Sequence, residues 1–289
     1  MNQLKITNGE DEYTIRLDSI KLLLGNNQKA KYRIQKLLSL YFNPVKSEYR
    51  EENKYKPVVY LDGKPIDIKR VTYIEISDNF SILDESKLGV KSLLYKYLES
   101  LLSDYEYFDT VNTIDILFDS LAQELNEQSI FNLEFNKMTS KQLVKLVTPS
   151  YINELQMDEY DLDVKELLDI QLQMIEYLQN HNTKTEKYII YVNSVEITDE
   201  FINKLKNLKN TFALVNLQTI TNIDNLNELY ITENIMLDLA DENLLYDYFG
   251  EENGALITLQ EVQSKVMNYI EKNYSEKQVH LINDIKKIN

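Results

Sequence analysis

The stretch from Ile20 to Tyr41 constrains the fold of this chain more than any other. A short apolar run stops at Gly25, a polar loop follows, and apolar residues then recur at helical spacing, namely Ile34, Leu37, Leu38 and Tyr41. A strand, a tight loop and a helix in this order are the frame of a phosphate-binding loop. The stretch therefore predicts an α/β fold organised around one strand and the helix that follows it.

Two positions of this loop differ from a working phosphate-binding motif. Gly25 and Lys31 keep the spacing of the motif, but Ala30 replaces its second glycine and Tyr32 replaces its hydroxyl residue. Ala30 adds a methyl group where the backbone must approach a phosphate, and the phenol of Tyr32 lies too far out to bind a magnesium ion held against the loop. We therefore expect no nucleotide to bind and no ATP or GTP to be hydrolysed.

The composition limits the other chemistry that the chain can perform. Its 289 residues suffice for one large or two ordinary domains. It has no cysteine and only two histidines, His181 and His280, so we expect any metal to be held by oxygen. No apolar run approaches the ~20 residues of a membrane span, and the first residues lack a hydrophobic signal core. We therefore expect a soluble, cytoplasmic protein without a membrane partner.

The formal net charge of −16 is distributed unevenly. Residues 1–70 carry 14 basic and 9 acidic residues, whereas residues 71–289 carry 17 and 38. A local basic surface can hold phosphate even on an acidic protein. Only four of the basic residues are arginine, and lysine suits phosphate better than bidentate contacts with guanine. Any contact with DNA should therefore be independent of its sequence.

The second half of the chain repeats the strand–helix–strand order. An unalternating apolar run, Lys187 to Val192, is followed by a helix from Asp199 to Leu208 and by a second run, Phe212 to Leu217. In a nucleotide hydrolase the first strand would end in an aspartate that binds magnesium through water, and here it ends in neutral Asn193. Near the N-terminus, Asn8-Gly9 and Asp62-Gly63 predict two hairpins.

Between these regions the sequence predicts helices, from about Asp84 to Gln179. Asp163 and Glu166 form a capping box for a long helix starting at Val164. Residues 131–135 predict a strand or an extended connector. The segment from Glu251 to Asn289 has apolar residues at helical spacing, among them Leu259, Val262, Val266, Ile270, Val279, Ile282 and Ile285, and predicts a helical extension.

Two segments of the sequence are similar to a known family. Lys187-Tyr-Ile-Ile-Tyr-Val-Asn-Ser194, with the acidic helix and aliphatic strand that follow it, resembles the Leu-Ile-Phe-Val-Asn-Ser segment of the CRISPR type II-A adaptation protein called Csn-two. The segment from Asn132 to Thr139, Asn-Leu-Glu-Phe-Asn-Lys-Met-Thr, is similar to a second segment of that family, Asp-Leu-Glu-Tyr-Asp-Glu-Ile-Thr. The resemblance follows the order of elements over most of residues 1–240, and the tail after Gly250 is longer than in short members.

The resemblance implies a domain organisation. Residues 1–84 and 184–250 would form a discontinuous α/β head domain with a parallel sheet, like a P-loop ATPase with a degenerate loop. Residues 85–183 would form an inserted α-helical leg domain, and residues 251–289 a C-terminal helical extension. It also implies a homotetrameric ring that threads double-stranded DNA, binds calcium and assists spacer acquisition in antiviral defence, alongside the CRISPR integrase complex and the effector nuclease.

Calcium requires six to eight oxygen ligands. Three glutamates precede or belong to the second family-like segment and are our candidates for metal binding: Glu124, Glu127 and Glu134. A denser acidic cluster lies nearby, at Asp158, Glu159, Asp161 and Asp163, which can equally be solvated helix ends. The family has aspartate where Asn132 and Asn136 stand, which reduces the number of strong ligands.

For DNA, lysines spaced four residues apart in the helical region should lie on one helix face, namely Lys137, Lys141 and Lys145. A second set of candidates surrounds the loop: Lys29, Lys31 and Arg33. The sequence therefore predicts a non-catalytic ring protein that binds double-stranded DNA ends without reading sequence. Two alternatives remain, an active P-loop nucleotide hydrolase and a DNA-free scaffold for protein interactions.

Overall fold

The computed structural model describes residues 1–44, 56–151, 158–182, 184–221, 225–252 and 255–275. The chain forms two compact units, which we name the head (Met1–Asp78 and Lys184–Asn289) and the leg (Asn79–Thr183). The first boundary falls before the expected residue 84, because Ser81 already caps the first helix of the leg. The C-terminal helix is part of the head, since the Ile220 amide donates to the carbonyl of Tyr274 at 2.9 Å.

The head contains most of the strands. Its elements are β1 (Asn2–Thr7), β2 (Glu12–Leu17), β3 (Ile20–Leu24), α1 (Gln28–Phe42), β4 (Val58–Leu61), β5 (Lys64–Pro65), β6 (Val71–Ser77), β7 (Lys187–Asn193), α7 (Asp199–Asn207), β8 (Thr211–Leu217), β9 (Leu229–Thr232), β10 (Met236–Asp238), α8 (Glu242–Phe249), β11 (Glu251–Glu252), β12 (Ala255–Leu256) and α9 (Leu259–Tyr274).

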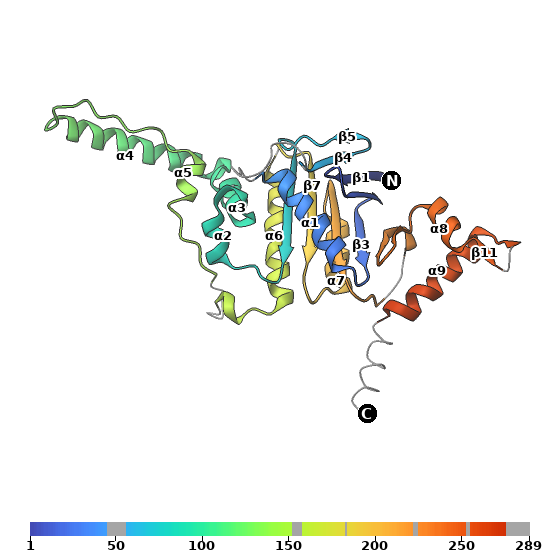
Figure 1. Ribbon diagram of the computed structural model, residues 1–289. Coiled ribbons are helices and arrows are strands. Elements are labelled where there is room, and N and C mark those ends of the chain that lie inside the picture. The colour runs from blue at the N-terminus through green and yellow to red at the C-terminus, as the bar shows by residue number, and fades with distance from the viewer. Residues whose placement is uncertain (45–55, 152–157, 183, 222–224, 253–254, 276–289) are drawn as a thin grey trace. The chain divides into compact units, whose positions relative to one another are not determined.

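A six-stranded sheet forms the centre of the head, in the order β10-β9-β3-β8-β7-β6 (Figure 1). All neighbours in this sheet are parallel except β10, which pairs antiparallel with β9 at one edge. The fold is therefore α/β with a mixed, mostly parallel sheet. β7 lies between β6 and β8, and its run from Tyr188 to Val192 is buried throughout, as expected of a strand covered on both faces.

A smaller antiparallel sheet, in the order β2-β1-β4-β5, packs on one face of the central sheet together with α1. Its two tight turns follow from their sequences. Gly9 has a φ of +90° between β1 and β2, and Asp62 and Gly63 have φ values of 51° and 75° between β4 and β5. Positive φ at both central residues is the requirement of a type I′ hairpin, which Asp-Gly meets. The two expected hairpins are thus confirmed.

The core of the head joins three layers. Apolar residues of the small sheet, of α1 and of the central sheet form one buried cluster, which includes Leu4, Ile15, Ile34, Leu38, Leu23, Tyr191 and Leu214. Burial of each large apolar side chain stabilises the fold by ~1.5–3 kcal/mol. α1 is thereby held against the sheet at a fixed angle, which in turn fixes the loop at its N-terminus.

The leg consists of helices: α2 (Ile82–Leu88), α3 (Leu93–Leu102), α4 (Phe108–Asn126), α5 (Ser140–Val144) and α6 (Val164–His181). α3 packs against α2, α5 and α6. The side chain of Asp163 accepts from the Glu166 amide, and the side chain of Glu166 accepts from the Asp163 amide. The expected capping box at the start of α6 is thus confirmed. Residues 131–135 form no strand and are an extended connector. None of the helices in the described ranges is long and apolar enough to cross a membrane.

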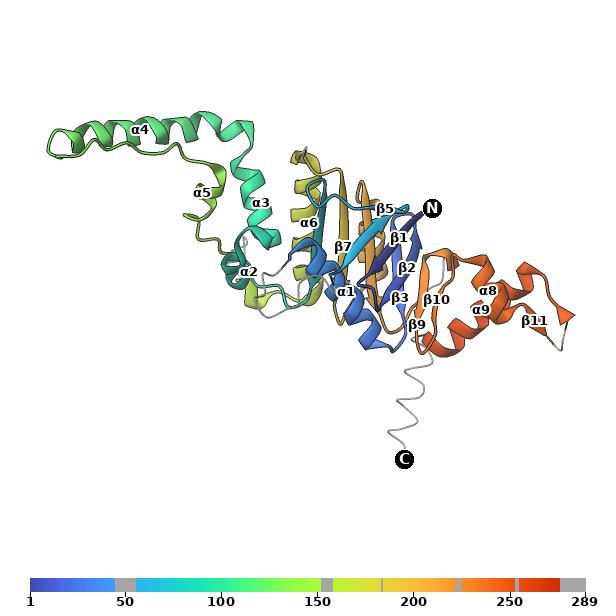
Figure 2. The ribbon, with the colours of Figure 1, turned by 45° about the horizontal axis from the view of Figure 1, so that its top comes forward.

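α4 and the segment that returns from its end form an arm, residues 108–136, which extends away from the other helices of the leg (Figures 1 and 2). The side chain of Asn126 clasps the returning backbone, donating to the Leu133 carbonyl at 2.9 Å and accepting from its amide at 2.7 Å. Further along, the rings of Phe118 and Phe135 stack with centroids 5.1 Å apart. These contacts hold the returning segment along one side of α4.

One expectation lies partly outside the described residues. In the predicted C-terminal extension, α9 covers Leu259–Tyr274, whereas Val279, Ile282 and Ile285 lie beyond the described residues.

A buried ion pair ties the edge of the central sheet to β2 and β3. Lys21 is fully buried, and its ammonium donates to the carbonyls of Arg16 at 2.7 Å and Asn227 at 2.8 Å and to the carboxylate of Asp238. The same carboxylate accepts from the Arg16 amide at 2.6 Å. Burial lowers the pKa of Lys21, and the charge of Asp238 opposes that shift.

We expect Asp238→Ala to lower the free energy of unfolding by about 3–5 kcal/mol, because it leaves the buried ammonium of Lys21 without its counter-charge. Urea unfolding measures this loss. The matched control is Glu12→Ala, which breaks the exposed pair with Lys5 and should cost about 0–1 kcal/mol. Equal losses for the two variants would contradict the buried pair's role.

Candidate functional site: the loop between β3 and α1

The loop after β3 makes a tight turn into α1. Gly25 has a φ of +125°, and a Cβ atom at this position would lie 2.5 Å from the carbonyl oxygen of Thr232. Only glycine fits there. Asn27 caps α1, accepting from the amide of Ala30 at 3.0 Å, so the helix begins directly after the loop.

The lysine of the motif is turned into the protein. The side chain of Lys31 is 1% exposed, and its ammonium donates to the carbonyl of Gly25 at 2.7 Å and to the carbonyl of Leu217 at 2.6 Å. These acceptors lie at the ends of β3 and β8, the two strands on which the loop rests. The charge that would meet a phosphate therefore binds backbone carbonyls instead.

The loop's free amides are also occupied by the protein itself. The carboxylate of Glu233 accepts from the amide of Asn26 at 2.9 Å and from the hydroxyl of Tyr274 at 3.1 Å. The amide of Asn27 donates to the carbonyl of Thr232 at 3.0 Å. A carboxylate thus stands at the N-terminus of α1, where a nucleotide hydrolase would bind an anionic phosphate.

Electrostatics reinforce this arrangement. Burial lowers the pKa of Lys31 to about 8, and the charge of Glu233 opposes the shift. A phosphate entering the loop would meet the like charge of Glu233, and Lys31 would have to give up both carbonyls to reach it. The geometry therefore disfavours nucleotide binding more strongly than the two substitutions in the sequence alone suggest.

The substituted positions agree with this arrangement. Ala30 is buried and Tyr32 is exposed, so the phenol is directed away from the loop. Asn193, at the end of β7, accepts from the side-chain amide of Asn216 at 2.8 Å. A neutral amide thus occupies the place of the magnesium-binding aspartate.

The structure gives the three DNA candidates around the loop different surroundings. Lys31 is buried and cannot contact DNA while it binds the two carbonyls. Arg33 is neutralised by an ion pair with Asp11 at 2.6 Å. Lys29 is exposed. Sequence reasoning missed Lys36, which is also exposed and follows Lys29 by two helical turns.

Together with Tyr32, these two lysines form a stripe on the outer face of α1, which we name the α1 stripe (Lys29, Tyr32 and Lys36). Their i, i+3, i+7 spacing puts them on one helix face. Neither lysine has an ion-pair partner within the described residues. The spacing was present in the sequence, but the choice between the two sides of α1 needed the packing of the helix.

In the leg, Lys137, Lys141 and Lys145 are all exposed, but they do not share a helix face. α5 is only five residues long, so Lys137 precedes it and Lys145 follows it. Thr139 caps α5 and forms a capping box with Gln142, which starts the helix after Lys137. The predicted single face is therefore wrong, whereas their exposure leaves all three available to a ligand.

The glutamates predicted to bind metal lie at the end of the arm. Glu124 is on α4, Glu127 ends that helix, and Glu134 is on the returning segment, where its carboxylate accepts from the side chain of Asn132 at 3.3 Å. Within the described ranges, no group of three or more acidic or histidine side chains is placed to hold a metal ion. The cluster at residues 158–163 instead caps helices, as Glu159 does for α2 by accepting from the Ile82 amide at 2.7 Å.

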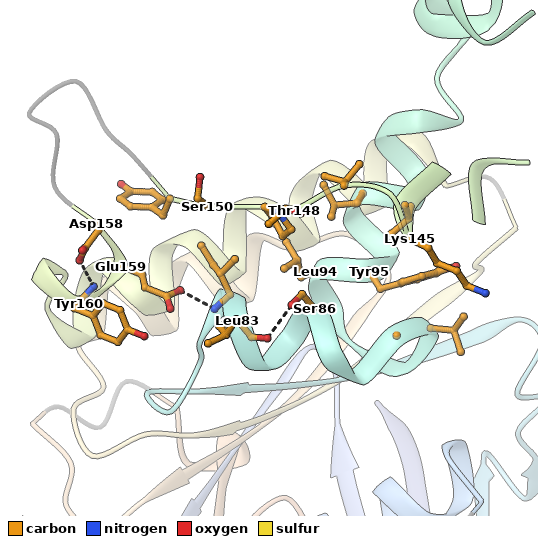
Figure 3. A pocket seen from close by; sticks show the side chains of 18 residues that line it. Leu83, Ser86, Leu94, Tyr95, Lys145, Thr148, Ser150, Asp158, Glu159 and Tyr160 are labelled. Carbon is orange, nitrogen blue, oxygen red and sulfur yellow. Dashed lines mark hydrogen bonds between the residues drawn. The ribbon is translucent and has the colours of Figure 1, made fainter. Parts of the chain in front are cut away.

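A cavity of about 430 Å³ in the leg is lined mainly by apolar side chains of α2, α3 and the segment after α5. Figure 3 shows Lys145 at one end of it and Asp158 with Glu159 at the other. The polar groups there bond to neighbouring backbone, as Ser86 does to the Leu83 carbonyl at 2.8 Å. Among the described residues that line the cavity, no set of polar groups converges in the way that catalysis needs.

Comparison with known proteins supports the fold. The chain is similar to the crystal structure of Stu0660 of Streptococcus thermophilus, with a TM-score of 0.64 and 18% sequence identity, over 89% of this chain and 82% of that one. It also aligns with the recombination mediator protein RecF–ATP of the RecFOR pathway, at 10% identity over 81% of this chain and 97% of that one, with a TM-score of 0.36. A score this low does not establish a shared fold.

No protein-family profile and no curated protein matches the sequence.

The buried position of Lys31 predicts a pH effect. Its folded pKa of about 8 lies below the unfolded value of ~10.5, so between these values the unfolded state binds the extra proton and stability rises with pH. We expect the difference in unfolding free energy between wild type and Lys31→Met to grow in favour of wild type from about pH 7.5 to pH 10. Urea titrations at several pH values measure it, and a constant difference would contradict the assignment.

Proposed function

We propose that this protein binds double-stranded DNA without reading its sequence and without catalysing a reaction. One observation carries the proposal. In the loop between β3 and α1, where a nucleotide-binding protein would hold phosphate, the side chains of Lys31 and Glu233 bond to the protein's own backbone. Such a fold keeps a rigid scaffold and lacks the means to hold a nucleotide. Its exposed lysines lie elsewhere, on surfaces suited to a long polyanion.

Two surfaces are proposed to contact DNA phosphates. One is the α1 stripe, in which the exposed ring of Tyr32 lies between Lys29 and Lys36. The other is formed by the three exposed lysines at the base of the arm, Lys137, Lys141 and Lys145. Lysine contacts with phosphates supply affinity without sequence preference. The overall charge of −16 confines DNA to such local basic surfaces.

We propose further that the protein is a homotetrameric ring that slides onto free DNA ends and assists spacer acquisition in type II-A CRISPR systems, with the integrase complex and the effector nuclease as partners. The sequence resemblance to the Csn-two family supports this role. The fold similarity to the Streptococcus thermophilus protein is compatible with it.

The arm supports assembly of several copies. Leu117, Leu121 and Leu125 recur every four residues on α4, and all three are exposed. We name these residues the arm leucines. From residue 108 to residue 136 the arm has six acidic and no basic residues, so it is unsuited to DNA. An exposed apolar row of this kind marks a protein contact, and we propose that a second copy covers it.

Calcium, which the resemblance implies, is proposed without a defined site. Within the described residues no three acidic or histidine side chains come together to hold a metal ion, and no step of the proposed function depends on calcium.

Two other functions are distinguished by simple observations. A nucleotide hydrolase would require ATP turnover that Lys31→Met abolishes, and the buried Lys31 disfavours it. A scaffold that binds only proteins would use the arm leucines and would show no affinity for DNA. The exposed apolar row favours this second alternative over the first.

The DNA proposal is tested by gel shift with linear duplex. We expect the combined variant Lys137→Glu, Lys141→Glu and Lys145→Glu, and separately Lys29→Glu with Lys36→Glu, to weaken binding at least tenfold without changing the fold, because all five residues are exposed. Wild-type affinity should fall by ~0.9 logarithmic units per tenfold salt for each phosphate neutralised.

The matched control is Lys64→Glu with Lys272→Glu, which makes the same charge change as the α1-stripe variant at two other exposed lysines of the head. It should retain most of the affinity for DNA. An equal loss of affinity in the control would show that net charge, and not the α1 stripe, determines binding. Equal affinity for linear and closed-circular duplex would rule out binding at free ends.

The assembly is tested by light scattering. Leu117→Gln with Leu121→Gln should shift the protein toward smaller species, because the substitutions make an apolar contact polar while leaving the core unchanged. Ile116→Gln is the control: this residue is as exposed as Leu117, 66% against 64%, but lies on the other side of α4. A monomeric wild type, or an equal effect of Ile116→Gln, would contradict the proposed interface.

A further inference from the structure

A cavity of about 500 Å³ lies in the head beside the loop, bounded by the connection from β9 to β10 and by α8 and α9. Figure 2 shows these four elements next to one another. Four aromatic residues line the cavity: Tyr248, Phe249, Tyr269 and Tyr274. Among the described residues of the lining, the carboxylate of Glu233 is the only charged group. The DNA-binding function proposed above makes no use of this cavity.

Two of the four aromatic residues that line the cavity are exposed and do not belong to the core of the head. Tyr248 is 51% and Tyr269 is 39% exposed, although both line the cavity. The ring of Tyr269 lies edge-on to that of Tyr274, with centroids 6.1 Å apart, and is tilted by 55° against that of Phe249 at 6.2 Å. Tyr269 is thus paired with both neighbouring rings, and the face of an aromatic ring carries the negative part of its quadrupole.

Glu233 gives the cavity a negative charge. One oxygen of its carboxylate accepts from Asn26 and Tyr274, and within the described residues the carboxylate forms no ion pair. Lys31, whose charge acts on Glu233, is buried and directs its ammonium to two carbonyls. None of the described residues that line the cavity is basic, so its charge repels phosphate and attracts a cation.

We propose that this cavity binds an organic ammonium ion whose head carries methyl groups. A methylated head has few or no N–H groups that need acceptors, and it places its charge against ring faces through apolar contacts. The exposed tyrosines supply the faces and Glu233 supplies the opposite charge. The same head can come from a methylated lysine of a partner protein or from a free quaternary amine.

Choline chloride is the probe for this site, measured by calorimetry and by the NMR signals of the tyrosine rings. We expect choline to bind at least about twofold more tightly than the uncharged analogue in which carbon replaces nitrogen, since a cation–π contact contributes this much even at an exposed site. Ammonium chloride at the same ionic strength should not displace choline. Equal binding of the uncharged analogue, or displacement by ammonium, would overturn the proposal.

Two variants and one control locate the site. Tyr248→Leu removes an exposed ring, and Glu233→Gln removes the charge while keeping an oxygen for Asn26; each should weaken choline binding at least about twofold. Tyr105→Leu changes an exposed tyrosine of the leg and should have no effect. Unchanged affinity of the Tyr248→Leu protein, with its melting temperature preserved, would overturn the assignment.

A trimethyllysine peptide and choline, compared on the same protein, distinguish the two sources. Tighter binding of the peptide identifies a protein ligand, and equal binding identifies the free amine. Either result supports the cation site. Because no DNA is present, these outcomes are independent of the proposed DNA binding.

Discussion

The ammonium group of Lys31, buried against the carbonyls of Gly25 and Leu217, is the interaction on which the loop and its surroundings depend. It joins the ends of β3 and β8 to the first turn of α1. The same lysine in a working motif would keep its charge free for a phosphate. Here the charge satisfies the backbone of the protein itself, so a frame typical of ligand binding has become part of the scaffold.

Glu233 complements this change. It reaches the Asn26 amide from the far end of β9 and supplies the anion that the N-terminus of α1 would otherwise attract. Its position has a second consequence, because its remaining negative charge faces a cavity with tyrosine walls. The residue that closes the loop to phosphate thus makes the neighbouring cavity attractive to a cation.

The distribution of charge divides the possible partners between surfaces. The α1 stripe and the lysines at the base of the arm are basic surfaces suited to a polyanion. The charged residues of the arm, in contrast, are all acidic, and they lie beside an exposed apolar row. Like charge disfavours DNA at the arm, and the exposed apolar row is the surface proposed to contact a second copy. In the proposed function, DNA and protein partners would thus use different surfaces of the chain.

The sequence by itself determined the local elements. The run Tyr188 to Val192 predicted a strand covered on both faces, Asp62-Gly63 a tight hairpin, and Asp163 with Glu166 the start of α6. These features follow from neighbouring residues, through side-chain periodicity, turn conformation and capping. The loss of the close-approach glycine at Ala30 was also visible without a structure.

Only the tertiary structure decided where the charges of these elements lie. Glu233 is separated from Asn26 by 207 residues, and the acceptor of Lys31 on Leu217 by 186. No local pattern reports such a contact, so Lys31 looked like a free cation and Lys36 was overlooked. The short β9 and β10 and the brevity of α5 likewise depend on their neighbours in space. Local rules specify which element forms, whereas packing decides which side of it is buried and therefore which charges remain for a partner.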